Sequence, residues 1–120
     1  MVMMMRKRPE VIQPVYNDGF AKFYDIIEKT DEWGTPIRGE FEKGNLQLEI
    51  WFRYLGITAQ DVYYAKADDE NLTSKIAVRG NIRINTKWQL EINDVNYQIY
   101  RTYFNPKNNE SELSLVEVSP

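Results

Sequence analysis

The sequence predicts a mainly β protein, a small antiparallel β-barrel or sandwich of five to six strands with one short α-helix. Several short runs alternate apolar and polar residues, most clearly LQLEIWFRY at 46–54. The connections between the runs are short, which favours antiparallel neighbours. One segment, residues 57–67, instead carries helix signals. Rolling such a small sheet into a barrel or sandwich covers its edges.

The composition limits the kind of protein. At 120 residues and 42% hydrophobic content the chain is the size of one domain with its own core. It contains no cysteine and no histidine, which excludes disulfides, thiolate nucleophiles, Ser-His-Asp chemistry and histidine-based metal sites. We therefore expect no enzyme activity, no catalytic residue, no metal and no cofactor. The net charge of −3 argues against broad binding to nucleic-acid phosphates.

The chain is expected to divide into a flexible N-terminal arm, residues 1–19, and a single β-barrel domain, residues 20–120. The arm contains two prolines and an NDG turn signal. Its start, MVMMMRKR, lacks the order of a secretory signal and is read as cytosolic. No run approaches the roughly 18 apolar residues of a membrane span, so no membrane partner is expected.

The first half of the domain contains one ambiguous segment and two turn signals. In FAKFYDII, residues 20–27, the apolar residues recur at helical spacing, but so short a run also admits a strand. DEWGTP at 31–36 predicts a turn, and a second turn is expected at 42–45 before the strand at 46–54.

The helix signals begin at Thr58. This residue can act as N-cap, and Asp61 stands where the acid of a capping box belongs, so the helix should start at Ala59. About ten residues are marginal as an isolated helix in water. The segment must therefore be held by its own domain or by a neighbouring molecule.

The second half of the domain has four further strand signals. A hairpin turn at NDVN, residues 93–96, is favoured because Asn and Asp tolerate left-handed backbone geometry, and NPKNNES at 105–111 predicts a longer loop. The four strand signals are KIAVR at 75–79, WQLEI at 88–92, YQIYRTYF at 97–104 and ELSLVEV at 112–118.

Surface aromatic and basic residues are candidates for contacts with partners or with other subunits. The spacing of Arg79, Arg83 and Lys87 would place them on one strand face, where a basic rim could touch phosphate; scattered solubilising charge is the alternative. Trp51 either meets another surface or shields the outer face of the barrel. The predicted interface set is Trp33, Trp51, Arg53, Arg79, Arg83 and Lys87.

Four segments, taken in order, resemble the head-tail joining family of tailed bacteriophages, the stopper or head-completion proteins of siphophage connectors. The resemblance lies in their order along the chain and covers roughly residues 20–118. The turn between residues 93 and 97 departs from the family, because that turn commonly carries a Gly and none stands here. The four segments are TDEWGTPIRGE at 30–40, EIWFRYLGITAQDVYYAKA at 49–67, WQLEINDVNYQIYR at 88–101 and ELSLVEV at 112–118.

The resemblance implies a ring of twelve copies below the portal and adaptor that closes the DNA exit channel and provides the docking platform for the tail. Partners would be other copies of the chain, adaptor and tail-completion proteins and, transiently, the packaged double-stranded DNA. The protein would reside in the virion head-tail connector, and in the host cytoplasm during assembly. The resemblance also favours strand for residues 20–29.

The same resemblance implies that the segment after the strand at 46–54 faces the channel as a gate. Acids there would repel DNA phosphates, so that DNA is retained sterically without adhesion. The alternative function is a small β-barrel binding module for peptide or single-stranded nucleic acid. The implied gate residues are Thr58, Asp61, Tyr63, Tyr64, Lys66, Asp68, Asp69 and Glu70.

Overall fold

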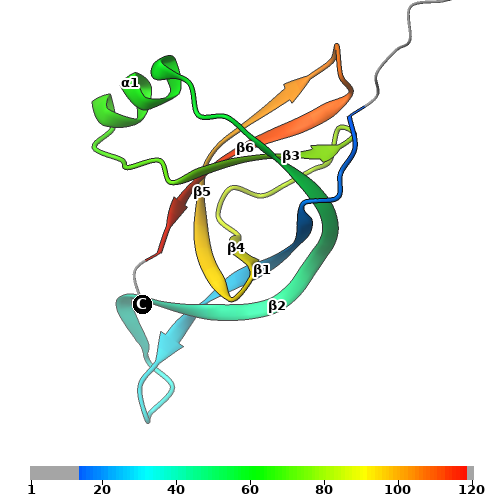
Figure 1. The fold of residues 1–120 in the computed structure, drawn as a ribbon. Coiled ribbons are helices and arrows are strands. Elements are labelled where there is room, and N and C mark those ends of the chain that lie inside the picture. Colours follow the sequence, from blue (N-terminus) through cyan, green and yellow to red (C-terminus); the bar gives the residue numbers. More distant parts are fainter. Residues whose placement is uncertain (1–13, 119–120) are drawn as a thin grey trace, which may run out of the picture.

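The computed structural model describes residues 14–118, with the exception of the side chains of residues 38–41. Six strands and one helix are assigned in this range, and the strands form a closed antiparallel barrel in the order β1-β2-β3-β6-β5-β4 (Figure 1). This confirms the predicted fold class. The elements are β1 (Gly19–Thr30), β2 (Pro36–Leu55), α1 (Ala59–Ala67), β3 (Ser74–Arg79), β4 (Gln89–Ile92), β5 (Val95–Asn105) and β6 (Glu110–Glu117).

The barrel closes through the short strand β4. Its residue Leu90 lies opposite Phe23 of β1 and also opposite Tyr97 of β5, so β4 joins the first strand to the C-terminal half of the chain. β3 pairs with β2 on one side and β6 on the other. Each barrel strand thus has two hydrogen-bonded neighbours, which removes the exposed edges that promote aggregation.

The core lies inside the barrel and is built by the alternation that predicted the strands. Because successive side chains of a strand point to opposite faces, every second residue enters the interior. Large fully buried side chains come from five of the six strands, which packs the interior without any contribution from the helix. They are Phe23, Phe52, Ile76, Val78, Leu90, Leu113 and Leu115.

Two expectations for the first half of the chain have opposite outcomes. The segment 20–29 is strand, as predicted, because β1 runs through it; its helical spacing does not decide the structure. The turn expected at 42–45 is wrong, since β2 continues through these residues. The register between β1 and β2 shifts on both sides of Tyr24, and the Asn45 N–H donates to the Asp25 carboxylate. The polar residues 42–45 thus lie in an irregular part of the β1–β2 ladder rather than in a turn.

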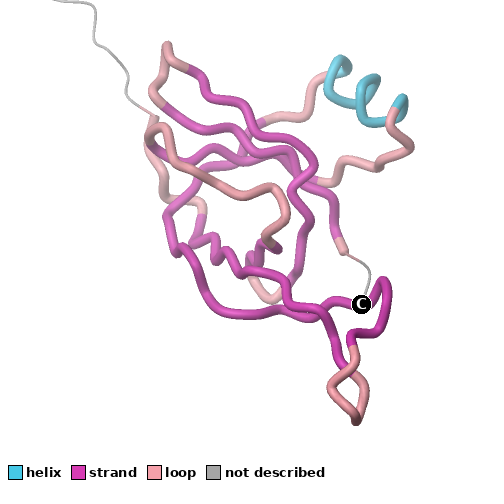
Figure 2. Tube along the Cα trace, turned by 180° about the vertical axis from the view of Figure 1, so that it is seen from behind, coloured by secondary structure: helices cyan, strands magenta, loops and turns pink. Residues whose placement is uncertain are grey.

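Beyond the barrel, β1 and β2 continue as a two-stranded hairpin extension, residues 25–45. Residues 22–24 of β1 still pair with β4, but further along β1 pairs only with β2. The extension projects from the barrel and ends in the turn at residues 31–35 (Figures 1 and 2). The predicted turn at 31–36 is therefore confirmed, at the tip of an element whose length was not expected.

The other connections agree with their turn chemistry, with one exception. Asn93 and Asp94 have φ of 50° and 64° between the paired residues Ile92 and Val95, which is a two-residue turn with both residues left-handed. This confirms the predicted hairpin without glycine. The exception is the segment 80–88, which contains no strand.

The N-terminal arm is described only from residue 14 onward, and residues 1–13 of the expected arm lie outside the described residues. In the described part, Asp18 accepts a hydrogen bond from the Tyr54 N–H at 2.7 Å and its own N–H donates to the Phe52 carbonyl at 3.0 Å. Residues 16–19 thus contact the barrel, and β1 begins at Gly19.

Candidate functional site

The helix α1 begins where the sequence predicts. The Thr58 hydroxyl accepts a hydrogen bond from the Asp61 N–H at 3.1 Å, and the Asp61 carboxylate accepts one from the Thr58 N–H at 2.9 Å. Together they form the expected capping box. The predicted start at Ala59 is confirmed.

The acidic cluster closes the helix at its other end. Asp68 is the C-cap, Asp69 takes a left-handed φ of 59°, and the Glu70 N–H donates to the Ala65 carbonyl at 2.7 Å. The negative end of a helix dipole disfavours carboxylates. These three acids therefore do not stabilise α1 through its dipole.

Polar contacts attach α1 to the outside of the barrel. Near the N-terminus of the helix, Lys75 of β3 pairs with Asp61 at 3.1 Å. Near its C-terminus, the Tyr100 hydroxyl of β5 donates to the Asp68 carboxylate, and the Arg101 guanidinium lies 5.9 Å from the centre of the Tyr64 ring. Polar groups of the barrel thus hold the helix at both of its ends.

Only one side chain of α1 is buried, that of Ala65. Tyr63 is 71% exposed and Tyr64 45% exposed, and the two rings meet edge to face with centroids 5.6 Å apart. Thr58, Lys66, Asp68 and Asp69 are exposed, and Glu70 is half-buried. The predicted gate residues therefore form one accessible segment.

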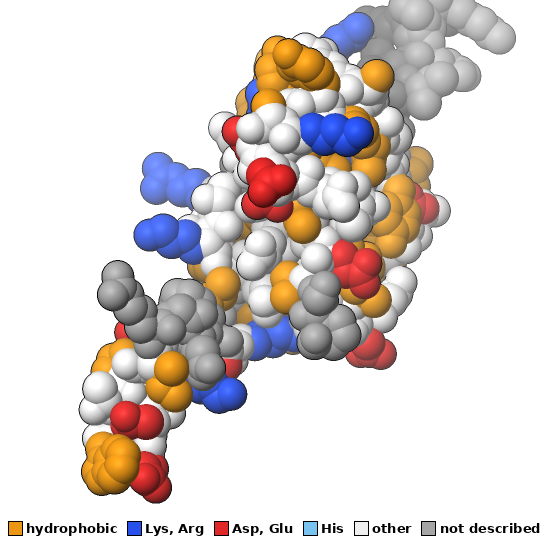
Figure 3. All heavy atoms as spheres, turned by 90° about the vertical axis from the view of Figure 1, so that its left-hand side faces the viewer, with side chains coloured by type: hydrophobic (Ala, Val, Ile, Leu, Met, Phe, Trp, Pro, Cys, Tyr) orange, Lys and Arg blue, Asp and Glu red, His pale blue; other side chains and the backbone are white. Residues whose placement is uncertain are grey.

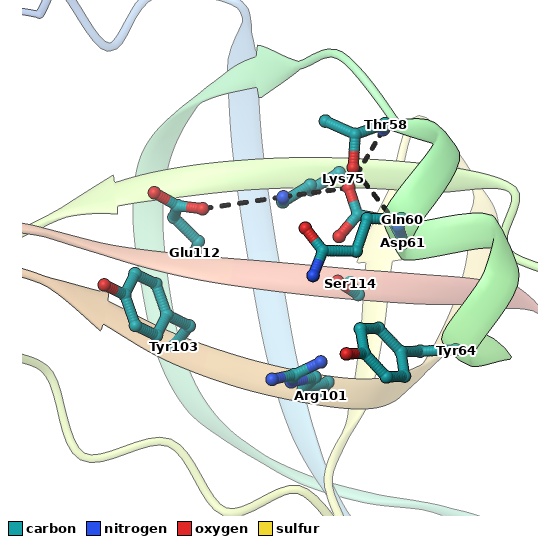
Figure 4. A pocket seen from close by; sticks show the side chains of 9 residues that line it. All are labelled: Thr58, Gln60, Asp61, Tyr64, Lys75, Arg101, Tyr103, Glu112 and Ser114. Atoms are coloured by element: carbon teal, nitrogen blue, oxygen red, sulfur yellow. Dashed lines mark hydrogen bonds and ion pairs between the residues drawn. The ribbon is translucent and has the colours of Figure 1, made fainter.

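A groove of about 630 Å³ separates α1 from the outer face of β3, β6 and β5 (Figure 4). Lys75 lies on its floor between two acids, 3.1 Å from Asp61 and 3.6 Å from Glu112. The ammonium of Lys75 and the carboxylates of Asp61 and Glu112 thus neutralise one another within the groove. Its lining residues are Thr58, Gln60, Asp61, Tyr64, Lys75, Arg101, Tyr103, Glu112 and Ser114.

The charge of Asp61 is maintained by its hydrogen bonds. Burial alone would raise its pKa, but the Thr58 N–H and the Lys75 ammonium outweigh that effect and hold the pKa below its usual range. Within residues 14–118 no group of three or more acids could hold a metal ion. The groove is thus lined by paired charged groups together with tyrosine and arginine side chains.

The predicted interface residues are distributed over the molecule. Trp33 is at the tip of the hairpin extension and 81% exposed, whereas Trp51 is half-exposed and packs against Phe20, with the ring planes tilted and the centroids 4.0 Å apart. Arg83 and Lys87 lie in the loop 80–88. The expectation that they share a strand face with Arg79 is wrong, because β3 ends at Arg79.

Two members of that set have partners within their own subunit. Arg53 Nη2 lies 2.6 Å from Glu110 Oε1, and the Arg79 guanidinium lies 5.4 Å from the centre of the Tyr16 ring. Tyr16 also donates to Glu110 Oε2 at 2.8 Å. Arg53 is thus engaged in holding the barrel and residue 16 together.

No pattern in the sequence indicates that Tyr16 and Glu110 are joined by a hydrogen bond and share a contact with Arg53. One stands in the expected arm and the other in an expected polar loop, and no spacing connects residues 94 positions apart. Burial alone would raise the pKa of Glu110, but hydrogen bonds from Arg53 and Tyr16 lower it overall. The carboxylate is 1% exposed, so it is a buried charge that its partners satisfy.

Comparisons with known proteins show similarity in fold. No family model matches the chain, and no curated protein matches it. The described residues contain no helix long and apolar enough to cross a membrane.

The solution structure of protein SF1141 from Shigella flexneri 2a is similar at a TM-score of 0.60 and 13% identity, over 87% of this chain and 95% of that one. A chain in the virion of the native gene transfer agent particle is similar at a TM-score of 0.54 and 13% identity, over 90% of this chain and 100% of that one.

Proposed function

We propose that this chain is a structural protein of a phage-like virion, and more closely a head-tail joining stopper that forms a ring below the portal and adaptor. The similarity to the chain in the gene transfer agent virion carries the proposal. It covers 90% of this chain and all of the other, so the similarity extends over most of the fold rather than over one hairpin.

The placement of α1 supports a gate. The helix stands outside the barrel between β2 and β3, held by polar contacts at its two ends, with one buried side chain. An element with little apolar burial can move without opening the core. In the ring, this segment faces the channel and obstructs it until the tail has joined.

The acidic cluster supports the same role. Asp68 accepts the Tyr100 hydroxyl. Asp69 and Glu70, by contrast, stand near the helix end where the dipole disfavours them, which indicates a reason other than helix stability. Acids presented to the channel repel DNA phosphates, so the genome is held back sterically and released without adhesion. Contact with DNA is then transient, and the lasting partners are the adaptor, the tail-completion protein and other copies of this chain.

The test is complementation of a phage that lacks its own copy of this gene. Filled heads that lose DNA and fail to join tails are expected in the deletion, and plasmid-borne protein should restore DNA retention and tail joining. Ordinary infectious particles in the deletion would contradict the proposal. Cryo-electron microscopy of the restored particles should show a ring of this chain between portal and tail.

The second candidate is a binding module for peptide or single-stranded nucleic acid. The groove beside α1 favours it, because Arg101, Tyr64 and Tyr103 line an accessible face of the barrel. Fluorescence anisotropy with labelled oligonucleotides and peptides separates the two. Binding that a change of Arg101 to Ala abolishes, without any defect in particles, would favour the module.

A further inference from the structure

An exposed tryptophan stands at the tip of the hairpin extension in an ordered turn. Asp31 Oδ1 accepts hydrogen bonds from the Trp33 and Thr35 N–H groups, each at 2.9 Å, and Gly34 closes the turn with a φ of 79°. The indole above this turn is 81% exposed. A large aromatic side chain on a fixed backbone loses little entropy when it binds, which is why tryptophan is enriched at interface hot spots.

The hairpin extension has no core of its own. None of its described side chains is buried, and strand pairing within it involves only its own two strands. A lone two-stranded hairpin is marginally stable in water. A partner that covers this element would therefore stabilise it, and Figure 3 shows hydrophobic and acidic side chains together at its end.

A second apolar feature lies at the other end of the same two strands. Val15 is 66%, Phe20 42% and Trp51 50% exposed. Together with Pro14 and Arg79 they line a hollow of about 690 Å³, and we call Pro14, Val15, Phe20 and Trp51 the apolar patch. Contiguous exposed apolar side chains of this kind mark an interaction surface.

The tip cannot reach the apolar patch of its own subunit. Phe20 pairs with Trp51 at the beginning of β1, and Thr30 pairs with Pro36 beside the tip. Ten residues of strand separate the two ends, which corresponds to about 33 Å at about 3.3 Å per residue. The tip and the patch face opposite ends of one ladder and are free to contact different neighbours.

Their charges are complementary. Residues 28–36 hold Glu28, Asp31 and Glu32 against one lysine, whereas residues 79–88 hold two arginines and one lysine and no acid. Arg79 is the member of this stretch that lines the hollow, whereas Lys87 lines a different pocket together with Asp25. Glu49 also lines the hollow, and Lys22 is its cross-strand neighbour.

We propose that the tip of one copy docks on the apolar patch of a second copy, with Trp33 in the hollow beside Phe20 and Trp51 and with the tip acids toward Arg79. The contact uses two different surfaces, so it is head-to-tail and generates a ring where the rotation closes. The proposed contact adds to the proposed function, and the expectation that it closes a ring rests on that function. Closure of the ring makes the contact lasting, because each copy is then held by two neighbours at once.

The absence of cysteine makes disulfide trapping a direct test. Thr35→Cys places a thiol beside Trp33 without removing it, and Val15→Cys places one in the patch. The two single-cysteine proteins, one of them tagged, are mixed and oxidised with diamide over a series of concentrations. The matched control replaces Val15→Cys by Lys66→Cys, an exposed position on α1. The 35–15 heterodimer should exceed the 35–66 heterodimer by about tenfold, because docking raises the effective concentration of the paired thiols.

Two further arms make the test specific. Adding Trp33→Ala to the Thr35→Cys protein should lower the 35–15 yield several-fold, and Glu32→Lys should lower it in a salt-dependent way. Circular dichroism of each variant should be unchanged, because both side chains are exposed. Equal 35–15 and 35–66 yields, or a yield that Trp33→Ala leaves intact, would overturn the proposal.

Crosslinking in assembled particles, together with complementation, distinguishes failure of this inference from failure of the proposed function. If complementation succeeds but oxidised particles contain no 35–15 link, or the thiol introduced at position 35 links only to another virion protein, the head-to-tail contact is wrong and the stopper function stands. If complementation fails while purified protein gives the specific 35–15 link, the contact is correct and the stopper function is wrong.

Discussion

Arg53 of β2 and Glu110 of β6 are joined across the intervening strand β3, with Nη2 2.6 Å from Oε1 and Nε 3.1 Å from Oε2. The arrangement is a two-point contact between guanidinium and carboxylate, and Tyr16 adds a third hydrogen bond. It connects the start of the described chain, the middle of the long strand and the beginning of the last strand.

Glu110→Gln should lower the free energy of unfolding of the barrel more than a Glu→Gln change in a more exposed ion pair. Removing the negative charge leaves Arg53 and Tyr16 without their charged acceptor, which costs about 1–3 kcal/mol in this partly buried setting. Glu91→Gln is the matched control, because its pair with Lys43 at 2.9 Å is more exposed and should contribute about 0–1 kcal/mol. Urea unfolding followed by tryptophan fluorescence measures both. Equal effects would show that Glu110 has no special structural role.

Acid should weaken the fold through three carboxylates. The hydrogen bond from Lys43 lowers the pKa of Glu91, and hydrogen bonds outweigh burial to lower the pKa of Asp61 and Glu110. A folded-state pKa below the unfolded value means that the unfolded chain binds more protons, so stability rises with pH. The contribution is fully present above the unfolded pKa of about 4 and is lost as pH falls through the folded values.

This pH dependence is checked by the midpoint of thermal unfolding between pH 7 and pH 3. The midpoint should fall on acidification below about pH 4.5. Glu110→Gln should show a smaller fall, because one of the three contributions is already absent. An unchanged slope in that variant would contradict the assignment of Glu110.

Gly44→Ala should disturb the junction between the barrel and the hairpin extension. A Cβ at this position would overlap the Asp25 carboxylate, which also accepts the Asn45 N–H. Overlap with a hydrogen-bonded acid costs about 1–3 kcal/mol. Gly56→Ala is the control, because nothing lies within 4 Å of its Cβ position. Hydrogen exchange of residues 24–46 should accelerate in the first variant and not in the second.

The sequence predicted what local chemistry determines. The alternation in 46–54, the cap at Thr58 and the left-handed turn at Asn93 and Asp94 each act over a few residues, and each is present. The helix at 59–67 was likewise predicted from its cap signals, whereas its role as a gate follows from the resemblance and stays a proposal. The closing pair of β1 with β4 and the contact of Tyr16 with Glu110 join distant residues, and no local pattern encodes them.

The wrong expectations also have a physical cause. Polar residues at 42–45 were read as a turn, but a two-stranded extension with two solvated faces needs no apolar alternation. Conversely, the spacing of Arg79, Arg83 and Lys87 suggested one strand face, whereas β3 ends at Arg79 and Gly80 takes a φ of 87°. In the first case strand pairing overrode the local pattern, and in the second the spacing of three charges did not define a strand.

The last prediction concerns the acids at the end of α1. Asp69→Lys together with Glu70→Lys reverses two charges per subunit while leaving Asp68, which accepts the Tyr100 hydroxyl, in place. Lysines at a helix C-terminus favour the dipole, so the helix should persist. If the segment faces the channel, the ring becomes attractive to DNA within the Debye length of about 10 Å. Virions should assemble and retain DNA but eject it several-fold more slowly, with the defect shrinking as salt rises.

Two matched variants separate charge from structure in the same assay. Asp69→Asn with Glu70→Gln removes charge without reversing it and should eject DNA at nearly the normal rate, because the native acids only prevent adhesion. Tyr63→Ala with Tyr64→Ala removes the paired rings and should make filled heads leak DNA in a manner that salt does not correct, since the defect is steric. Ejection is timed in receptor-triggered virions, and retention is measured in tailless heads. If the lysine variant ejects normally at low salt and the alanine variant retains DNA normally, α1 does not gate the channel.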